Sequence, residues 1–250
     1  MINIKEKLDD YLEFDSSKLF IDESVRIFGG AIRDIIAEQE INDIDILLGL
    51  NPKRVIGTGE HNIQFNRYSE IEKVLLEEGY IHHSSLGGRE ITSMYNMLLV
   101  IHEPKTWIKG KKIIQLIRPN FFRDRIKNAK WFDHKLYTEV YNRFRKLSSV
   151  EVIHFMNNFA AQVDLSCCGV SYDGKSLYEN IQYAVLHCQN KYFMLNTNGL
   201  MFNEARIIYR ESKLWKRGWK KINSTDTQLI RDFKISSLFS DTQLEFIKQW

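Results

Sequence analysis

The spacing of hydrophobic residues changes between the two halves of the chain. Apolar residues at helical spacing predict helices over residues 3–13, 31–40, 68–78, 123–147, 150–159, 176–187 and 203–217. Short apolar or alternating runs predict strands over residues 25–28, 43–48, 94–102, 112–117 and 163–172. Most of the strands fall in the first half. The pattern therefore predicts an α+β fold, with a mixed small sheet flanked by helices and a mainly helical C-terminal part.

The composition is that of an ordinary globular protein, with 44% hydrophobic and 27% charged residues. No run approaches the roughly 20 apolar residues that span a bilayer, and the opening MINIKEKLDDYLEF lacks the layout of a secretion signal. We therefore expect a cytoplasmic protein with no membrane partner. The net charge of +3 does not by itself indicate a nucleic-acid partner. Three cysteines without metal-ligand spacing, Cys167, Cys168 and Cys188, are expected to be buried reduced thiols.

The most informative stretch is FGGAIRDIIAEQEINDIDI, which begins at Phe28. Gly29 and Gly30 separate a predicted strand from a predicted helix, so the backbone there can approach a ligand closely. Exposed amides at a helix N-terminus favour a phosphate group. A tight turn between strand and helix also requires glycine for steric reasons alone, so the two glycines do not decide between these interpretations.

Two carboxylates follow on the next predicted strand. Asp43 and Asp45 are two positions apart, so both side chains point to one face of a strand. Like charges held so close repel each other unless a cation neutralises them. Magnesium commonly takes one or two carboxylates together with substrate phosphates. A solvated edge strand can carry the same pair, but its place directly after the glycine turn favours a metal site.

These residues resemble the head-domain motif of the tRNA nucleotidyltransferase and bacterial poly(A) polymerase family, within the DNA polymerase beta-like nucleotidyltransferase superfamily. The matching positions are Gly29, Gly30, Ile32, Arg33, Asp34, Asp43 and Asp45. VDLSCCGVSYDG, from Val163 to Gly174, resembles the family's Asp-Phe-Thr strand, and ARIIYRESKLWKRGW, from Ala205 to Trp219, resembles its neck helix. The shortness of the chain and its richness in Asn, Ile and Lys suggest a short, divergent, phage-type member.

The resemblance implies a nucleotidyltransferase head over residues 1–200, with an insertion at about 51–160, and a helical neck-like segment over 201–250. It implies a nucleoside triphosphate as substrate and Mg²⁺ or Mn²⁺ as cofactor. It assigns catalytic roles to Asp43, Asp45 and Asp164, metal binding to Asp43 and Asp45, and nucleotide binding to Gly29, Gly30, Arg33, Arg206 and Arg210. Two alternatives stay open: Arg33 can be a structural partner of Asp34, and Arg206 and Arg210 can be solvated basic residues.

The chain also departs from the family pattern. Residues 161–163, Ala-Gln-Val, stand where the family has two arginines before the aspartate, and Gln115 stands on the strand that often carries a third acid. No Glu-Asp-x-x-Arg segment follows the neck-like helix. These departures disfavour CCA addition, but they leave nucleotide transfer as the expected activity.

Basic and aromatic residues alternate in two segments, 105–132 and 211–221. Cations can follow phosphates while aromatic rings stack on bases, which predicts an RNA acceptor, with a tRNA or other 3′ end as the substrate. Helices with buried aromatic residues and a solvated basic face would give the same pattern. Two other functions stay open, namely transfer of a nucleotide to a protein or small molecule, and nucleotide or RNA binding by a catalytically degenerate scaffold.

Overall fold

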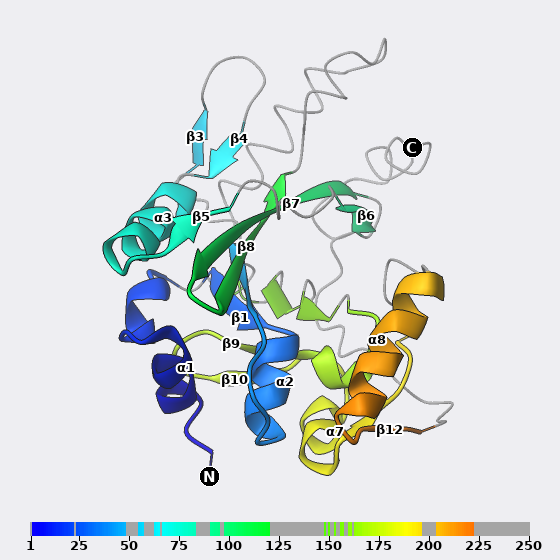
Figure 1. The fold of residues 1–250 in the computed structure, drawn as a ribbon. Coiled ribbons are helices and arrows are strands. Elements are labelled where there is room, and N and C mark those ends of the chain that lie inside the picture. Colours follow the sequence, from blue (N-terminus) through cyan, green and yellow to red (C-terminus); the bar gives the residue numbers. More distant parts are fainter. Residues whose placement is uncertain are drawn as a thin grey trace.

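The computed structural model describes residues 2–22, 24–48, 55–57, 63–65, 67–83, 91–95, 98–120, 163–196 and 204–222, together with single residues between 148 and 161. Its centre is a mixed sheet with the strand order β10-β9-β1-β2-β8-β7-β5, to which β6 adds by pairing with β7 (Figure 1). The strands are β1 (Val25–Phe28), β2 (Ile44–Leu48), β5 (Ile81–His82), β6 (Ile91–Tyr95), β7 (Leu98–Lys109), β8 (Lys112–Asn120), β9 (Val170–Tyr172) and β10 (Leu177–Glu179). Within this sheet β2 and β8 run parallel, and the other described pairs are antiparallel.

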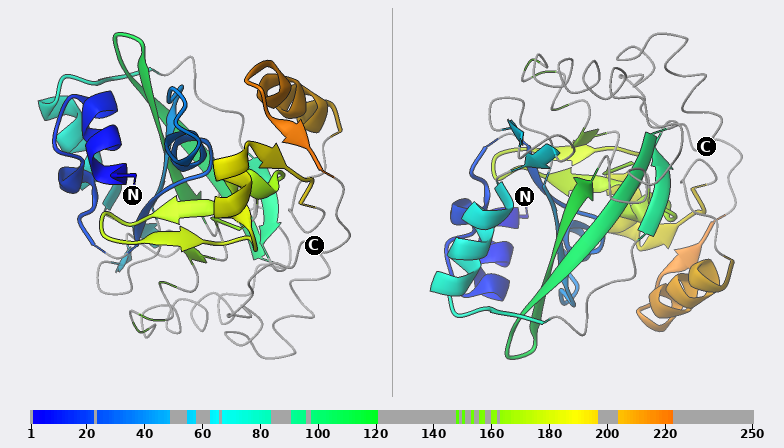
Figure 2. Two further views of the ribbon diagram at one scale, coloured as in Figure 1. Left: turned by 90° about the horizontal axis from the view of Figure 1, so that it is seen from below. Right: turned by 90° about the horizontal axis from the view of Figure 1, so that it is seen from above.

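Helices flank the sheet. They are α1 (Ile4–Leu12), α2 (Gly30–Ile36), α3 (Arg67–Glu77), α7 (Ala184–Asn190) and α8 (Glu204–Lys216), with short 3₁₀ turns η1 (Ser16–Leu19) and η4 (Ser166–Cys168). Two small sheets pair β3 (Val55–Gly57) with β4 (Ile63–Phe65), and β11 (Tyr192–Phe193) with β12 (Lys220–Lys221). Figures 1 and 2 show α1 and α3 together at one end of the molecule and α7 and α8 at the other. None of the helices in the described ranges is long and apolar enough to cross a bilayer.

The core lies between the central strands and helices α1 and α2. Ile27 of β1 and Ile44 of β2 are fully buried, and so are Leu8 of α1 and Ile32 of α2. Burying apolar surface at about 25 cal/mol per Å² is the main contribution to the stability of such a core. The next side chain of β2, Asp45, alternates to the opposite face of the sheet. Because Ile44 and Ile46 of β2 point into the core, the Asp45 side chain between them must point to the other face of the sheet.

The structure confirms most of the predicted elements in the first half, including β1, α1 and α3, within one residue at either end. Helix α2 ends at Ile36, four residues before the prediction. Strand content is confirmed in both predicted apolar runs by β7 and β8. The predicted helix over 123–147 lies outside the described residues. The division into residues 1–200 and 201–250 stays a prediction.

Two predicted elements after residue 160 are wrong. Only Val170–Tyr172 of the predicted strand over 163–172 is a strand, because η4 precedes it. The predicted helix over 176–187 is instead strand β10 followed by α7, which begins at Ala184. The Asp173 carboxylate accepts hydrogen bonds from two main-chain amides of the turn, at 2.9 and 2.7 Å, and so closes a β9–β10 hairpin. Helical spacing of apolar residues could not reveal this turn chemistry.

Candidate active site

The turn between β1 and α2 requires its first glycine. Gly29 has φ 73° and ψ −126°, a conformation that residues with a Cβ rarely adopt. Its amide donates to the carbonyl of Val170 at 3.0 Å, and its carbonyl accepts from the amide of Arg33 at 3.1 Å. Gly30 begins the helix without a positive φ, and a Cβ built there would meet only the Arg33 guanidinium, at 3.6 Å. The turn thus depends on Gly29 for its conformation.

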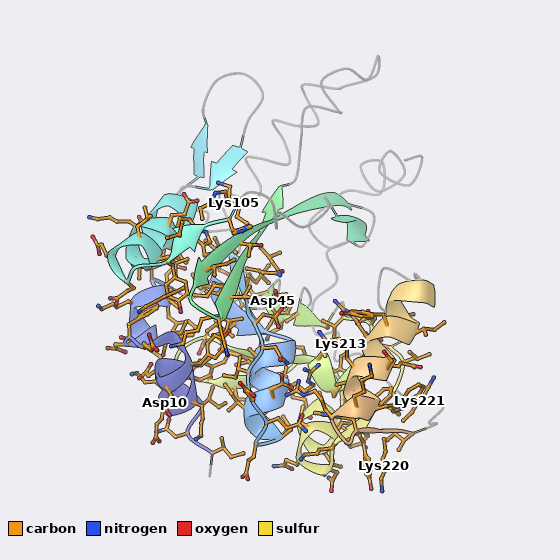
Figure 3. The ribbon with its side chains drawn as sticks, in the orientation of Figure 1. Asp10, Asp45, Lys105, Lys213, Lys220 and Lys221 are labelled. Carbon is orange, nitrogen blue, oxygen red and sulfur yellow. The ribbon has the colours of Figure 1, made fainter. Side chains whose placement is uncertain are left out.

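The sheet places Asp45 directly beside this turn. Asp45 is the register partner of Phe28, the last residue of β1, and on its other side it pairs with Gln115 of β8. Gln115 in turn pairs with Thr106 of β7. Register partners share one face of a sheet, so a polar row runs from Asp45 to Thr106. Gln115 thus stands on the parallel strand directly beside Asp45. Asp45 lies near the centre of the molecule in Figure 3.

Asp43 directly precedes β2, and the residue before it, Asn42, is held by a hydrogen bond from Tyr11 of α1. The Tyr11 hydroxyl donates to the carbonyl of Asn42 at 2.9 Å and accepts from the amide of Ile113 at 3.1 Å. One side chain therefore joins the starts of β2 and β8. Burial raises the pKa of the Tyr11 hydroxyl above its usual value, so it stays protonated and able to donate. This role could not be predicted from the sequence, in which Tyr11 is one of several residues on the inner face of a helix.

Asp164 forms an ion pair with Arg210 of α8. Burial of the Arg210 guanidinium lowers its pKa, but Asp164, Cys168 and Asp45 outweigh this effect, so its net pKa is raised. Arg210 thus lies within the electrostatic reach of both Asp164 and Asp45. Asn196 holds the chain around Asp164 in place: its amide donates to the Asp164 carbonyl at 2.8 Å and its side chain donates to the Val163 carbonyl at 2.7 Å.

Arg33 lies inside the protein. Its Nε donates to Asp34 Oδ1 at 2.7 Å, a second nitrogen lies 3.3 Å from the sulfur of Cys168, and its guanidinium lies 5.5 Å from the ring centroid of Trp219. Asp34 is 2% exposed and also accepts from Arg217, the residue that follows α8, at 2.9 Å. These contacts correspond to the structural alternative for Arg33. Arg206 lies in α8 one turn before Arg210.

All three cysteines are free and buried, as predicted. A hydrogen bond with Cys167 lowers the pKa of the Cys168 thiol, and burial opposes this, while the neighbouring Arg33 lowers it further. Burial raises the pKa of Cys167 and of Cys188. Cys168 is the cysteine that contacts Arg33, and all three thiols are packed inside the protein.

The sequence predicts the Asp43 and Asp45 carboxylates as the metal donors. Among the residues that the structure describes, no three His, Cys, Asp or Glu side chains gather in a way that could hold a metal ion. A closed metal site with many protein ligands is therefore not what these residues form. Two carboxylates on a face without a third acid fit Mg²⁺, which keeps several waters and completes its shell with substrate phosphates.

Comparisons with known proteins find likeness only at the level of structure. No family model matches the chain, and no curated protein is significantly similar to it. A CCA-adding enzyme in complex with CTP is 11% identical, with 90% of this chain and 45% of that chain covered and a TM-score of 0.47. The Thermotoga maritima CCA-adding enzyme in complex with tRNA is 10% identical, with 98% and 42% covered and a TM-score of 0.43.

The Bacillus stearothermophilus CCA-adding enzyme in complex with CTP is 11% identical, with 100% of this chain and 48% of that chain covered and a TM-score of 0.34. The chain thus spans less than half the length of each of these three proteins.

Proposed function

We propose that this protein is a metal-dependent nucleotidyltransferase, which moves a nucleoside monophosphate from a nucleoside triphosphate to an acceptor, an RNA 3′ end. One observation carries the proposal: the positive-φ glycine turn directly follows Phe28, the last residue of β1, and Phe28 is the register partner of Asp45 on β2. This arrangement offers main-chain amides and carboxylates on adjacent strands. A triphosphate needs both, because its charge must be held and neutralised while its α-phosphorus is attacked.

The chain's own residues have separable tasks in this proposal. The Gly29 amide itself donates to Val170, so the turn brings the β- and γ-phosphates to the main-chain amides at the start of α2. Asp43 and Asp45 hold the divalent cation on the sheet face, with Tyr11 supporting the strand start that carries Asp43. Bound Mg²⁺ or Mn²⁺ would supply charge neutralisation at the triphosphate and a lower pKa for the attacking hydroxyl. Catalysis by such a site relies on positioning and electrostatics.

The remaining site residues receive modified roles. The guanidinium of Arg33 contacts Asp34, Cys168 and Trp219, so we assign it to orienting α2 rather than to binding nucleotide. Asp164 acts as a positioning residue, because its carboxylate holds Arg210. Arg210 and Arg206, one helical turn apart, are the proposed phosphate contacts from α8.

A second candidate function is favoured by Gln115. An amide side chain stands in register with Asp45, on the strand where a third carboxylate would complete an acidic trio. A neutral side chain there weakens the hold on a second cation. The second candidate is therefore a catalytically inactive protein of the same fold, which binds a nucleotide without transferring it.

The deciding experiment measures transfer directly. Purified protein is incubated with each α-labelled nucleoside triphosphate, Mg²⁺ and total tRNA, and the products are separated on a denaturing gel. The test variants are Asp43→Asn and Asp45→Asn. Asp10→Asn is the matched control, because Asp10 is an exposed carboxylate on α1, away from Asp45 in Figure 3.

We expect label on RNA with the parent and with Asp10→Asn, and a loss of at least about a hundredfold with either site variant, since each removes charge stabilisation at the reacting phosphate. Label on protein or on a small molecule would keep the transfer but refute the RNA acceptor. Nucleotide binding without label on any acceptor would establish the second candidate.

A further inference from the structure

Helix α8 presents three different faces. Ile207, Glu211 and Leu214 are buried against the rest of the protein. Arg210, together with Arg217 directly after the helix, lies along one flank, where these two residues pair with Asp164 and Asp34. The remaining surface is exposed: Ile208 and Trp215 lie on the side next to the buried face, and Tyr209, Lys213 and Lys216 follow one another at positions i, i+4 and i+7. Residues at this spacing form a continuous ridge on a helix. We call these three residues the α8 ridge.

Burial in the core does not explain the ridge. The Tyr209 side chain is 62% exposed, although it lies between buried Ile207 and Glu211 in sequence. The Lys213 ammonium lies 5.6 Å from the Tyr209 ring centroid, so a cation and an aromatic ring are presented together. Within the described residues, no carboxylate forms an ion pair with Lys213 or Lys216. By contrast, Lys221 on β12 pairs with Glu211 at 2.7 Å.

The charge of this region favours an anionic partner. Between residues 204 and 221 there are only two acids, Glu204 and Glu211. The same stretch contains Arg206, Arg210, Lys213, Lys216, Arg217, Lys220 and Lys221. A surface that is basic and also displays an aromatic ring binds single-stranded nucleic acid, because cations follow the phosphates while the ring stacks on a base. A protein partner of ordinary composition would gain little from unpaired lysines at the centre of its interface.

The ridge also lies close to the candidate active site. Arg210, the residue that follows Tyr209, forms an ion pair with Asp164, and the negative charge of Asp45 contributes to the raised pKa of its guanidinium. In the view of Figure 3, Lys213 is labelled on the side of α8 that faces Asp45, whereas Lys220 and Lys221 are labelled at the lower end of α8. A strand held on the ridge would therefore lead to the carboxylate pair.

We propose that the α8 ridge is the docking site for the single-stranded end of the RNA acceptor, with one base stacked on Tyr209 and phosphates on Lys213 and Lys216. This inference rests on the proposed function and adds to it the surface that receives the acceptor. Single-stranded rather than duplex RNA fits, since an exposed ring can stack only on a base that is not already stacked within a helix.

The test measures binding without catalysis. A fluorescein-labelled single-stranded 15-nucleotide RNA of mixed sequence is titrated with protein, in the absence of nucleotide, at several salt concentrations. The variants are Tyr209→Ala, Tyr209→Phe, Lys213→Ala and Lys216→Ala. Lys7→Ala is the charge-matched control, because Lys7 is exposed on α1 at the other end of the molecule. Circular dichroism checks that every variant is folded, and binding of Mn²⁺-ATP is measured in parallel.

We expect Tyr209→Ala to weaken RNA binding about tenfold, as the loss of one stacked base does, and Tyr209→Phe to restore it. Lys213→Ala and Lys216→Ala should each lower the slope of log K against log salt by about 0.7, the value for one phosphate contact on a single strand. Lys7→Ala should bind as the parent does. All variants should bind Mn²⁺-ATP normally, because the ridge is separate from Asp43 and Asp45.

Three outcomes would overturn the inference. The parent and the ridge variants could bind the RNA equally well, or the parent could bind Mn²⁺-ATP but no RNA. The ridge variants could also change self-association in sedimentation while RNA binding is absent, which would make the ridge a protein interface. Failure to bind Mn²⁺-ATP, with RNA binding that depends on the ridge, would instead refute the proposed function and leave the ridge assignment in place.

Discussion

At the scale of single residues, backbone conformation and burial decide which positions tolerate change. Gly29 is constrained by its positive φ, and nothing lies within 4 Å of where its Cβ would be. Its neighbour Gly30 has no such constraint on φ. Two adjacent glycines of one motif therefore have different physical requirements, which can be separated by measurement.

We predict that Gly29→Ala lowers the free energy of unfolding by about 1–3 kcal/mol, the usual cost of holding a side-chain-bearing residue in a sparsely populated backbone region. Gly30→Ala should be neutral or stabilising, by up to about 1 kcal/mol, because alanine is favoured over glycine in a helix. Urea unfolding followed by circular dichroism measures both. Equal destabilisation by the two substitutions would contradict the assignment.

His187 is a buried base whose ionisation opposes folding. Burial lowers its pKa below the ordinary value, and its Nδ1 lies 2.9 Å from the Ser166 hydroxyl, which also accepts from the amide of Met194 at 3.0 Å. The unfolded state therefore binds a proton more readily than the folded state does. The stability that His187 contributes is present above the unfolded pKa of about 6.5 and is lost as the pH falls below it.

We predict that the parent loses more stability between pH 7.5 and pH 5.5 than His187→Asn does, because only in the parent does unfolding expose an imidazole that takes up a proton, which favours the unfolded state at the lower pH. The measurement is urea unfolding at both pH values, with the difference between the two proteins isolating His187 from the carboxylates. If both proteins lose the same stability, His187 does not titrate in this range.

At the scale of elements, α1 supports the strand starts that carry the carboxylates. Tyr11 joins the main chain of Asn42 and Ile113 through one hydroxyl. Tyr80 offers a matched comparison, because its hydroxyl also donates to a main-chain carbonyl, that of Leu12 at 3.3 Å, but in the core. Replacing Tyr11 or Tyr80 by phenylalanine therefore removes the same hydroxyl group, once beside the candidate site and once away from it.

We predict that Tyr11→Phe and Tyr80→Phe each lower the free energy of unfolding by about 1 kcal/mol, the usual value of a hydrogen bond. Only Tyr11→Phe should also weaken Mn²⁺ binding, by about three- to tenfold. This is a small effect for a residue that positions a metal ligand without binding the metal. Electron paramagnetic resonance of free Mn²⁺ measures this affinity. An equal loss of affinity in both variants would assign Tyr11 to general stability.

The elements that were predicted correctly are those whose pattern is local. Strands β1 and β2 and the turn at Gly29 follow from alternation and from glycine chemistry within a short stretch. The segment after Asp164 could not be predicted in this way. Its shape depends on a bridge between Leu165 and Leu195 and on the hydrogen bond from the Ser166 amide to the Met194 carbonyl at 2.9 Å. The contact of Arg33 with Cys168 is likewise set by tertiary packing.

At the scale of the whole molecule, α8 is tied to α2 by a cluster of polar contacts. Arg217 donates to Asp34 at 2.9 Å and to the carbonyl of Glu40 at 2.8 Å. The indole of Trp219 donates to the Gln39 side chain at 2.8 Å. These contacts fix the orientation of α8, and so the place of Arg210 at the site.

We predict that Arg217→Ala lowers the free energy of unfolding by about 2 kcal/mol, because it removes one of the two cations that contact buried Asp34. Hydrogen exchange should become faster in α8 but not in α1. Lys220→Ala, which removes an exposed cation nearby, should change neither. Unchanged exchange in α8 after Arg217→Ala would show that apolar packing alone fixes the helix.

The tie between α2 and α8 also has a consequence for the order in which the protein is made. Arg217 follows its partner Asp34 by 183 residues, and Trp219 follows Gln39 by 180. At a synthesis rate of about 5–20 residues per second, roughly ten to forty seconds separate the appearance of the two sides. During that interval the nascent strand-turn-helix unit carries Asp34 with Arg33 as its nearby cation. The two arginines that pair with buried Asp34 are therefore synthesised far apart in time. Arg33 is made with Asp34 itself, and Arg217 follows only when nearly the whole chain has been made.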